Sequence, residues 1–210
     1  MSKYFDWKTR IQKQELNECI NILRNDGVIV FPTETVYGIG ANAQSNIAVE
    51  KIFDIKQRPK QKAINIMVSD INEISKYAII KNELEKKIIQ KFMPGPITII
   101  LEKKDNIPDI VTAKNKKIGI RIPNNSIALK ILKTSKIPLA VPSANISGKQ
   151  SGTSINAIKQ DFDGKVDVFI DGGNSKIGEP STIVEIVNSE IIIHREGKIS
   201  KEEIIREIRS

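Results

Sequence analysis

Residues 28–40 read Val-Ile-Val-Phe-Pro-Thr-Glu-Thr-Val-Tyr-Gly-Ile-Gly. The apolar, β-branched residues 28–31 predict a buried strand that ends at Pro32, because proline has no N–H for a sheet ladder. Hydroxyl groups and a carboxylate follow directly, whereas a turn that only reverses the chain needs Gly, Asn or Asp. Polar groups at the carboxyl end of a strand are typical of a binding site in an open α/β sheet. The same residues also fit a long polar connection from strand to helix with locally bonded hydroxyls, and spacing favours neither interpretation.

On both sides of this stretch, predicted helices and strands are mixed. Helical apolar spacing and capping residues predict helices at residues 12–25, 45–58, 82–92 and 126–133, a short helix after Ser69 or Asp70, and a last helix after Ser200. Apolar runs predict strands at residues 63–68, 97–101, 118–122, 139–141, 166–170, 182–187 and 191–194, the last two as a hairpin. The chain lacks the regular strand–helix alternation of a doubly wound sheet, so we expect an α/β fold with a mixed sheet. The length of 210 residues favours a single domain over residues 1–210.

Composition restricts the class of protein. The single cysteine, Cys19, cannot form an internal disulfide and lies in a helical pattern, which predicts a core position in a reducing compartment. We expect no membrane span, since no run of about 18 apolar residues occurs, and residues 1–10 lack the apolar segment of a secretory signal. These features predict a cytoplasmic protein. The net charge of +8 favours anionic partners, but without a basic run interleaved with aromatics it fits lysines spread over a solvated surface.

The common catalytic motifs are absent. His194 is the only histidine and no serine stands in a G-x-S-x-G pattern, which argues against a Ser-His-Asp triad and favours a structural histidine. One cysteine and one histidine are too few for a zinc site. The chain has no phosphate-binding P-loop, and polar residues separate Gly38-Ile39-Gly40 from its strand, unlike a dinucleotide fingerprint.

A set of polar side chains near predicted strand ends remains. Its members are Thr33, Glu34, Thr35, Tyr37, Lys56, Arg58, Lys60, Arg121, Ser143, Asn145, Ser147, Ser151, Ser181, Thr182 and Arg195. Cations and hydroxyls without an obvious nucleophile suit a pocket for a phosphorylated ligand and a small carboxylate, in which catalysis works by positioning and charge neutralisation. Arg121 lies among apolar residues, and a buried guanidinium needs a carboxylate or phosphate partner. Residue type alone favours an internal ion pair, with Glu34 or Asp171, over a ligand.

Six motifs occur in order between residues 27 and 197, at residues 31–38, 56–59, 92–98, 120–123, 142–148 and 181–184, followed by Arg195 and Gly197. With these motifs the chain resembles the YrdC-like family of threonylcarbamoyl-AMP synthases, in the short form without an extra C-terminal domain. The resemblance implies a single YrdC-like domain, an open twisted mixed sheet with helices around it and a concave basic cavity.

The resemblance also implies an activity. The chain would be a nucleotidyltransferase that makes L-threonylcarbamoyl-adenylate from L-threonine, bicarbonate or CO2, and ATP, with release of pyrophosphate. The product would pass to a downstream threonylcarbamoyl transferase machinery that modifies tRNA. Mg²⁺ would be bound through the ATP phosphates, with no metal held by the protein.

The family's residue roles transfer to matching positions of this chain. The catalytic set, which also binds ATP, would be Lys56, Arg58, Ser143 and Asn145, and further ATP contacts would come from Lys60, Ser151 and Arg195. The threonine site would comprise Thr33, Tyr37, Arg121 and Ser181, with Arg121 on the threonine carboxylate.

Two departures from the family pattern fall near these positions. Ala63-Ile64 stands where many relatives have Pro-Leu, with Asn65 at a position that contacts threonine in some of them, and Pro180 precedes Ser181. Two other functions also fit the fold: a module that binds double-stranded RNA or tRNA, and a relative that activates another carbamoyl donor. The apolar neighbours of Arg121 favour the enzyme over RNA binding, and the chain lacks the zinc-finger segments that accompany YrdC-like modules of hydrogenase-maturation carbamoyltransferases.

Overall fold

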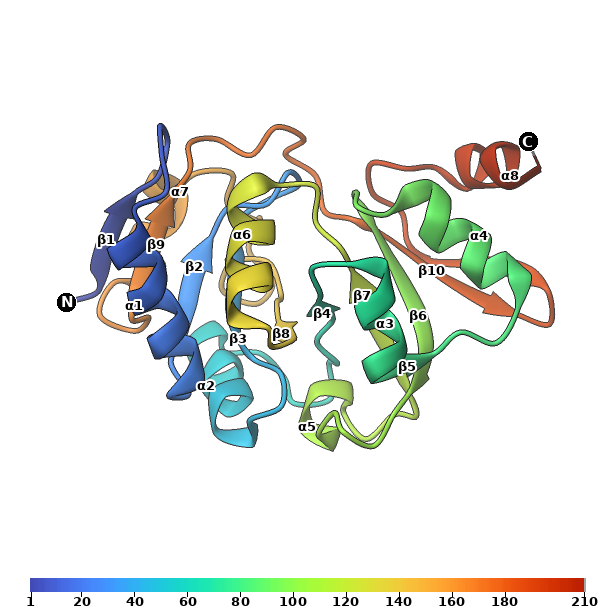
Figure 1. Cartoon of the computed structure of the whole chain (residues 1–210), viewed down its shortest axis with the longest axis horizontal. Helices are drawn as coiled ribbons and strands as arrows, with labels where there is room; N and C mark the ends of the chain where they lie inside the picture. The colour runs from blue at the N-terminus through green and yellow to red at the C-terminus, as the bar shows by residue number, and fades with distance from the viewer. Residues whose placement is uncertain (210) are drawn as a thin grey trace.

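The computed structural model describes residues 1–209, in which eleven strands form one sheet (Figure 1). The strands are β1 (Lys3–Asp6), β2 (Ile29–Phe31), β3 (Gly38–Asn42), β4 (Ile66–Met67), β5 (Ala78–Ile79), β6 (Ile97–Lys103), β7 (Lys117–Arg121), β8 (Leu139–Ala140), β9 (Val168–Asp171), β10 (Thr182–Val187) and β11 (Glu190–Arg195). Their order across the sheet is β1-β9-β2-β3-β8-β4-β7-β6-β10-β11, with β5 paired to β6. The pairs β1–β9, β2–β9, β4–β7 and β6–β10 are parallel, whereas the neighbours of β3 and β8 are antiparallel. The predicted α/β class with a mixed sheet is therefore confirmed.

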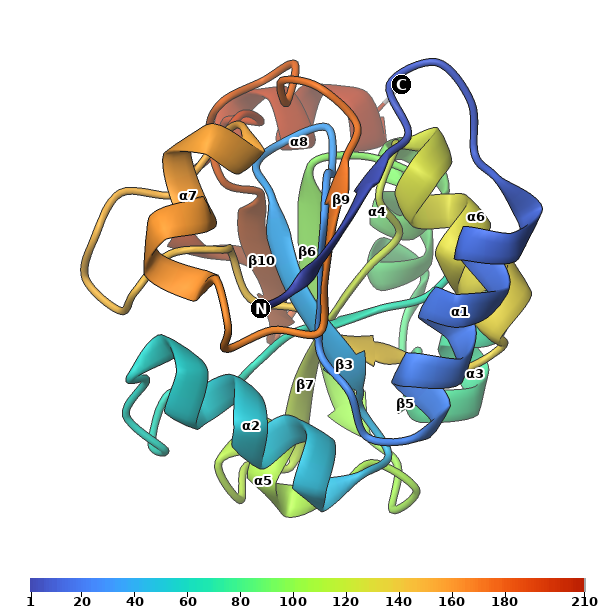
Figure 2. The ribbon, with the colours of Figure 1, turned by 90° about the vertical axis from the view of Figure 1, so that its left-hand side faces the viewer.

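Helices cover both faces of this sheet. They are α1 (Lys13–Arg24), α2 (Asn46–Lys56), α3 (Ile71–Tyr77), α4 (Glu83–Phe92), α5 (Asp109–Thr112), α6 (Ser126–Ser135), α7 (Ile155–Phe162) and α8 (Lys201–Arg209). Helices α1 and α6 lie side by side on one face, and α7 lies on the other, against β9 (Figure 2). Helices α4 and α8 pack together at the far end of the molecule (Figure 1). No helix within residues 1–209 combines the length and the apolar character that a membrane crossing requires.

The apolar side chains form two clusters that strand β2 separates. Ile29 and Phe31 belong to the cluster that contains Cys19 and the inner sides of α1 and α6, whereas Val28 and Val30 belong to the other. This alternation places consecutive side chains on opposite faces, as a strand requires. The predicted strand after residue 27 is thus buried on both faces, and the predicted core position of Cys19 is confirmed.

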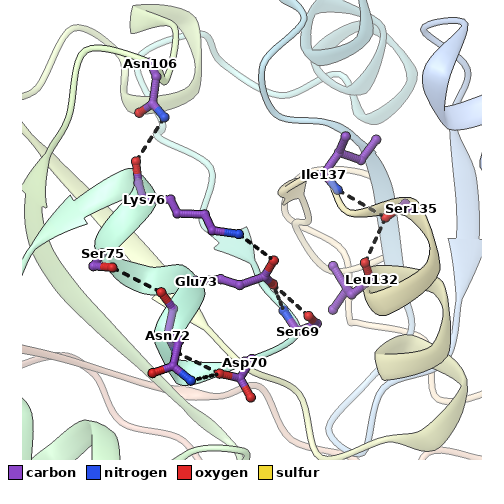
Figure 3. A network of polar contacts seen from close by, with 10 residues as sticks. All are labelled: Ser69, Asp70, Asn72, Glu73, Ser75, Lys76, Asn106, Leu132, Ser135 and Ile137. Atoms are coloured by element: carbon purple, nitrogen blue, oxygen red, sulfur yellow. Dashed lines mark hydrogen bonds and ion pairs between the residues drawn. The ribbon is translucent and has the colours of Figure 1, made fainter.

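Side-chain caps fix where several helices begin. Ser45, Asp70 and Asn82 accept hydrogen bonds from backbone N–H groups in the first turns of α2, α3 and α4, as the sequence predicts. At α3 the carboxylate of Glu73 also accepts from the backbone N and the hydroxyl of Ser69 (Figure 3). The caps tie each helix start to the end of the segment before it.

Some predicted boundaries are wrong. Gly38 and Gly40 belong to strand β3, which pairs antiparallel with β2, and not to a polar connection that runs on to a helix. A Cβ atom at Gly40 would lie 2.6 Å from the ring of Phe31, and one at Gly38 would lie 2.5 Å from a methyl group of Val141. The predicted strand over residues 63–68 shortens to β4, and β1 and α7 were not predicted.

Candidate functional site

A cavity of about 160 Å³ opens near the middle of the sheet. Its walls come from the segments after β2 and β8, the segments before β4 and β10, strand β6, and the ends of β7 and β11. Seven of the predicted site residues line it: Thr33, Tyr37, Arg58, Arg121, Ser143, Ser181 and Arg195. The fold thus brings together side chains that are up to 162 positions apart in the chain, since residues 33 and 195 both line the cavity.

Three arginines converge on this cavity, and no described residue that lines it is Asp or Glu. Arg58 donates to the carbonyl oxygen of Ala63 at 2.7 Å, and Arg195 donates to that of Ser181 at 2.8 Å. Burial lowers the pKa of Arg195, and the charges of Arg121 and Arg58 lower it further. Because neutral carbonyls hold Arg58 and Arg195, both guanidinium groups keep their charge available for an anionic ligand.

Arg121 is the buried member of this group. Its Nη2 lies 2.8 Å from Oε1 of Glu34, and its Nε donates to the carbonyl oxygen of Gly95 at 3.2 Å. The internal ion pair that residue type favoured is therefore present, with Glu34, whereas Asp171 bonds Tyr4 and Lys8. Burial lowers the pKa of Arg121, and the charge of Glu34 opposes that effect. Arg121 lines the cavity even so, which leaves it within reach of a ligand carboxylate.

The hydroxyl groups of the predicted threonine site are ordered by local bonds. Thr33 Oγ1 donates to the carbonyl oxygen of Val36 at 2.6 Å and lies 2.8 Å from Oγ1 of Thr35. Ser181 Oγ lies 2.9 Å from Oγ1 of Thr98 and accepts from Arg195 Nη2 at 3.2 Å. Since all these hydroxyls are buried, their orientation is set before any ligand arrives.

Tyr37 lines the cavity, but its hydroxyl bonds residues that do not. The hydroxyl donates to the carbonyl oxygen of Gly173 at 2.6 Å and accepts from the backbone N of Gly172 at 3.2 Å. Burial raises the pKa of this phenol, so it stays neutral at physiological pH. Tyr37 therefore anchors the glycine segment after β9 and shapes the pocket.

Ser143 and Asn145 belong to a polar loop after β8, and Lys56 bonds the backbone of this loop. Ser143 Oγ donates to Oδ1 of Asn145, and Lys56 Nζ donates to the backbone carbonyl oxygens of both residues. Lys56 is only 1% exposed and does not line the cavity. Burial, reinforced by the charge of Arg58, lowers the pKa of Lys56 to about 7.

Four predicted site residues lie outside the cavity wall: Lys56, Lys60, Asn145 and Ser151. Lys60 is exposed and forms an ion pair with Glu50.

Both departures from the family pattern, Ala63-Ile64 and Pro180, line the cavity, as does Asn65. Thr98 was not predicted as a site residue, although a threonine inside the apolar run of β6 was the available signal.

The single histidine has a local partner. His194 Nε2 lies 2.6 Å from Oε2 of Glu185, outside the cavity, which agrees with the predicted structural role. Within residues 1–209, no three His, Cys, Asp or Glu side chains are placed to hold a metal ion. The cavity wall therefore offers cations and hydroxyls, which bind carboxylate and phosphate oxygens.

Comparisons with known proteins agree with this geometry. The family model Sua5/YciO/YrdC, described as telomere recombination, matches residues 21–197. A putative threonylcarbamoyl-AMP synthase of Methanocaldococcus jannaschii is 45% identical over 204 residues, which are 97% of this chain and 96% of the relative. The threonylcarbamoyl-AMP synthase of Pyrococcus abyssi is 37% identical over 197 residues, which are 94% of this chain and 58% of that protein.

A solved structure shows that the similarity extends to the fold. The crystal structure of Pyrococcus abyssi Sua5 complexed with L-threonine superposes with a TM-score of 0.95 at 35% identity, over 99% of this chain and 61% of that chain. The chain thus spans almost the whole Methanocaldococcus relative but less than two thirds of the Pyrococcus protein. The open twisted mixed sheet with surrounding helices is therefore shared with this structure.

Proposed function

Because this chain belongs to the Sua5/YciO/YrdC family, we propose that it is a threonylcarbamoyl-AMP synthase. It joins L-threonine, bicarbonate or CO2, and ATP into L-threonylcarbamoyl-adenylate and releases pyrophosphate. The names of relatives that are 37% and 45% identical support this activity. The product serves the threonylcarbamoyl modification of tRNA through a downstream transferase, and residues 1–210 act as one YrdC-like domain.

The convergence of Arg58, Arg121 and Arg195 on one cavity carries the proposal. A triphosphate and an amino-acid carboxylate are both anions, and a cavity whose described lining contains no Asp or Glu suits them together. A charge-assisted hydrogen bond contributes about 1.5–3 kcal/mol, so a few of them supply much of the binding and transition-state energy.

Arg121, Thr33 and Ser181 form the threonine side of the site. The Arg121 guanidinium binds the carboxylate, and the buried hydroxyls of Thr33 and Ser181 are placed to bond the threonine side chain or its amine. Tyr37 also lines the pocket. A site built to bond a hydroxyl rejects an isostere that lacks it, because its own polar groups then stay unpaired.

Arg58, Ser143 and Arg195 form the ATP side. Lys56 and Asn145 support Ser143 from below, and Lys60 and Ser151 contact ATP from outside the cavity wall in our assignment. A wall of cations fits phosphate oxygens and leaves metal coordination to the phosphates themselves, so we expect Mg²⁺ to enter with ATP. When bound, the ion neutralises charge on the triphosphate.

The chemistry forms a C–N bond and an O–P bond, and it breaks an N–H bond of the amine, whose proton goes to solvent, and one P–O bond of ATP. The free amine of threonine adds to the carbon of CO2 and loses a proton, which gives a carbamate. A carbamate oxygen then attacks the α-phosphorus of ATP, and the bond from that phosphorus to the bridging oxygen of pyrophosphate breaks. The arginines stabilise the negative charge on the departing pyrophosphate, and the fixed threonine carboxylate holds the carbamate in line.

Pyrophosphate release tests the proposal. We expect the purified chain to release pyrophosphate from Mg-ATP only when both L-threonine and bicarbonate are present, with threonylcarbamoyl-adenylate detected by mass spectrometry. Reactions that omit threonine or bicarbonate are the controls. Release that ignores threonine would indicate a different carbamoyl acceptor, and no release, together with salt-dependent binding of double-stranded RNA, would indicate an RNA-binding module.

A further inference from the structure

Glu34 has no assigned role in the reaction, yet it is the carboxylate closest to the cavity arginines. It is only 6% exposed, and its Oε1 lies 2.8 Å from Arg121 Nη2. Apart from this ion pair, neither carboxylate oxygen of Glu34 nor Nη2 of Arg121 has a hydrogen-bond partner within residues 1–209. Buried polar atoms without a hydrogen bond lower the stability of the folded chain, so their presence at this ion pair needs an explanation.

The surroundings hold Glu34 on a rigid frame. Its backbone carbonyl accepts from the N–H of Ile177 at 2.9 Å, and the next carbonyl, of Thr35, accepts from Gly178 at 2.9 Å. These bonds connect the segment after β2 to the segment that precedes β10 and carries Ser181. The backbone that carries Glu34 is therefore fixed by contacts that do not depend on a ligand.

Arg121 is consequently held from two sides. The carbonyl oxygen of Gly95 accepts from Nε, and Glu34 attracts Nη2, while the guanidinium also lines the cavity. These two contacts determine how the planar guanidinium is turned about the axis of its side chain. A bidentate grip on a carboxylate needs that plane in one orientation.

We propose that Glu34 is a positioning residue, which orients Arg121 so that a free edge of its guanidinium faces the carboxylate of the bound amino acid. The inference rests on the proposed function, since it assumes that Arg121 binds L-threonine. A positioning role and a competing role make opposite predictions. If Glu34 competed with the ligand for Arg121, removal of its charge would tighten threonine binding; if it positions Arg121, removal weakens binding.

Substitution of Glu34 by glutamine separates these outcomes. We expect Glu34→Gln to raise the Kd of L-threonine about tenfold, while the Kd of Mg-ATP changes less than about twofold. Isothermal titration of the full chain with each ligand measures both constants. A threonine Kd that is unchanged or lower overturns the proposal, as does an equal loss for both ligands.

Glu185→Gln is the matched control. Glu185 is a similarly buried glutamate (7% exposed) that pairs with Lys117 and His194 outside the cavity. Its glutamine variant should lose thermal stability but keep the wild-type Kd for threonine. A threonine Kd that rises equally in both variants would show that any lost buried ion pair weakens binding, and would overturn the specific role of Glu34.

Glu34→Gln leaves a buried guanidinium uncompensated, so a second variant covers the case in which it does not fold. Glu34→Asp keeps the charge but withdraws it by one methylene, and the threonine Kd should rise about threefold with ATP binding unchanged. Wild-type threonine affinity in that variant overturns the proposal. A wild-type chain without threonine-dependent pyrophosphate release would refute the proposed function itself, a result that no Glu34 variant can imitate.

Discussion

Lys56 is a buried lysine that lies outside the cavity wall and bonds the backbone of the loop after β8. Burial and the charge of Arg58 lower its pKa from 10.5 to about 7, although two carbonyl oxygens accept from its Nζ. Between about pH 7 and pH 10.5, Lys56 carries its proton more often in the unfolded chain than in the folded chain. Lys56 therefore makes the free energy of unfolding rise with pH in that window, by at most about 1.4 kcal/mol per pH unit.

Replacement of Lys56 by methionine should remove this pH dependence. Urea unfolding of wild type and Lys56→Met at pH 7, 8 and 9 measures the change, and we expect the wild-type stability to gain about 1–3 kcal/mol more than that of the variant over this range. Lys60→Met is the control, since the hydrogen bond and charge of Glu50 raise the pKa of that exposed lysine, so it stays protonated in both states over this pH range. Parallel stability curves for wild type and Lys56→Met would contradict the lowered pKa.

At the level of single residues, the sequence predicted seven of the polar groups that line the cavity but left their partners open. Arg121 was expected to be buried because its neighbours in the strand are apolar, and it is 5% exposed. Residue type offered Glu34 and Asp171 as its ion-pair partners, but the choice of Glu34 depends on how the segment after β2 lies against the end of β7, which no local pattern encodes. Thr98 was missed for a related reason: a threonine suits any strand, and only the pairing of β6 with β10 brings it to Ser181.

At the level of elements, the β10–β11 hairpin places Ser181 and Arg195 together. After β11 the chain passes close to the start of β10 at Gly197. A Cβ atom there would lie 2.2 Å from the carbonyl oxygen of Pro180 and 2.7 Å from the carbonyl carbon of Ser181. Both contacts are with backbone, so a side chain at this position must displace the segment that precedes β10. Overpacking of this kind typically costs about 1–3 kcal/mol.

Gly197→Ala should therefore weaken ligand binding as well as stability. We expect a lower melting temperature and higher Kd values for both threonine and ATP, measured by calorimetry, because Ser181 and Arg195 move with the displaced segment. Gly164→Ala is the control: its φ of +75° makes alanine strained, but it has open space around it and lies away from the cavity. If Gly197→Ala binds both ligands as wild type does, the close approach does not position the site.

Strand β3 shows why part of the fold escaped prediction. Glycine is a poor strand former, so Gly38 and Gly40 favour a turn when read from the sequence. In the structure they are required because the ring of Phe31 and a methyl group of Val141 occupy the space that side chains would need. The helices with apolar spacing and capping residues were predicted correctly, because those signals are local, whereas the requirement for glycine arises from contacts between distant segments.

On the scale of the whole molecule, the cavity lies near the middle of the sheet, between segments that come from both halves of the strand order. The segments after β2 and β8 form one wall, and β6, β7 and the β10–β11 hairpin form the other. A ligand in the cavity contacts both walls, so its binding free energy adds to the stability of the folded chain as a whole. A ligand at 100 times its Kd stabilises a protein by about 2.7 kcal/mol, which is a rise of about 5–11 °C in melting temperature at this chain length.

Thermal unfolding with ligands therefore tests the site within the intact chain. L-Threonine at 100 times its Kd should raise the melting temperature of wild type by about 5–11 °C, and L-valine at the same concentration should raise it far less, since it lacks the hydroxyl. Arg121→Ala should lose the shift with threonine but keep the shift with Mg-ATP, because Arg58 and Arg195 remain in place. A full threonine shift in Arg121→Ala would show that another group binds the carboxylate, and an equal shift with valine would show that the hydroxyls of Thr33 and Ser181 do not select the side chain.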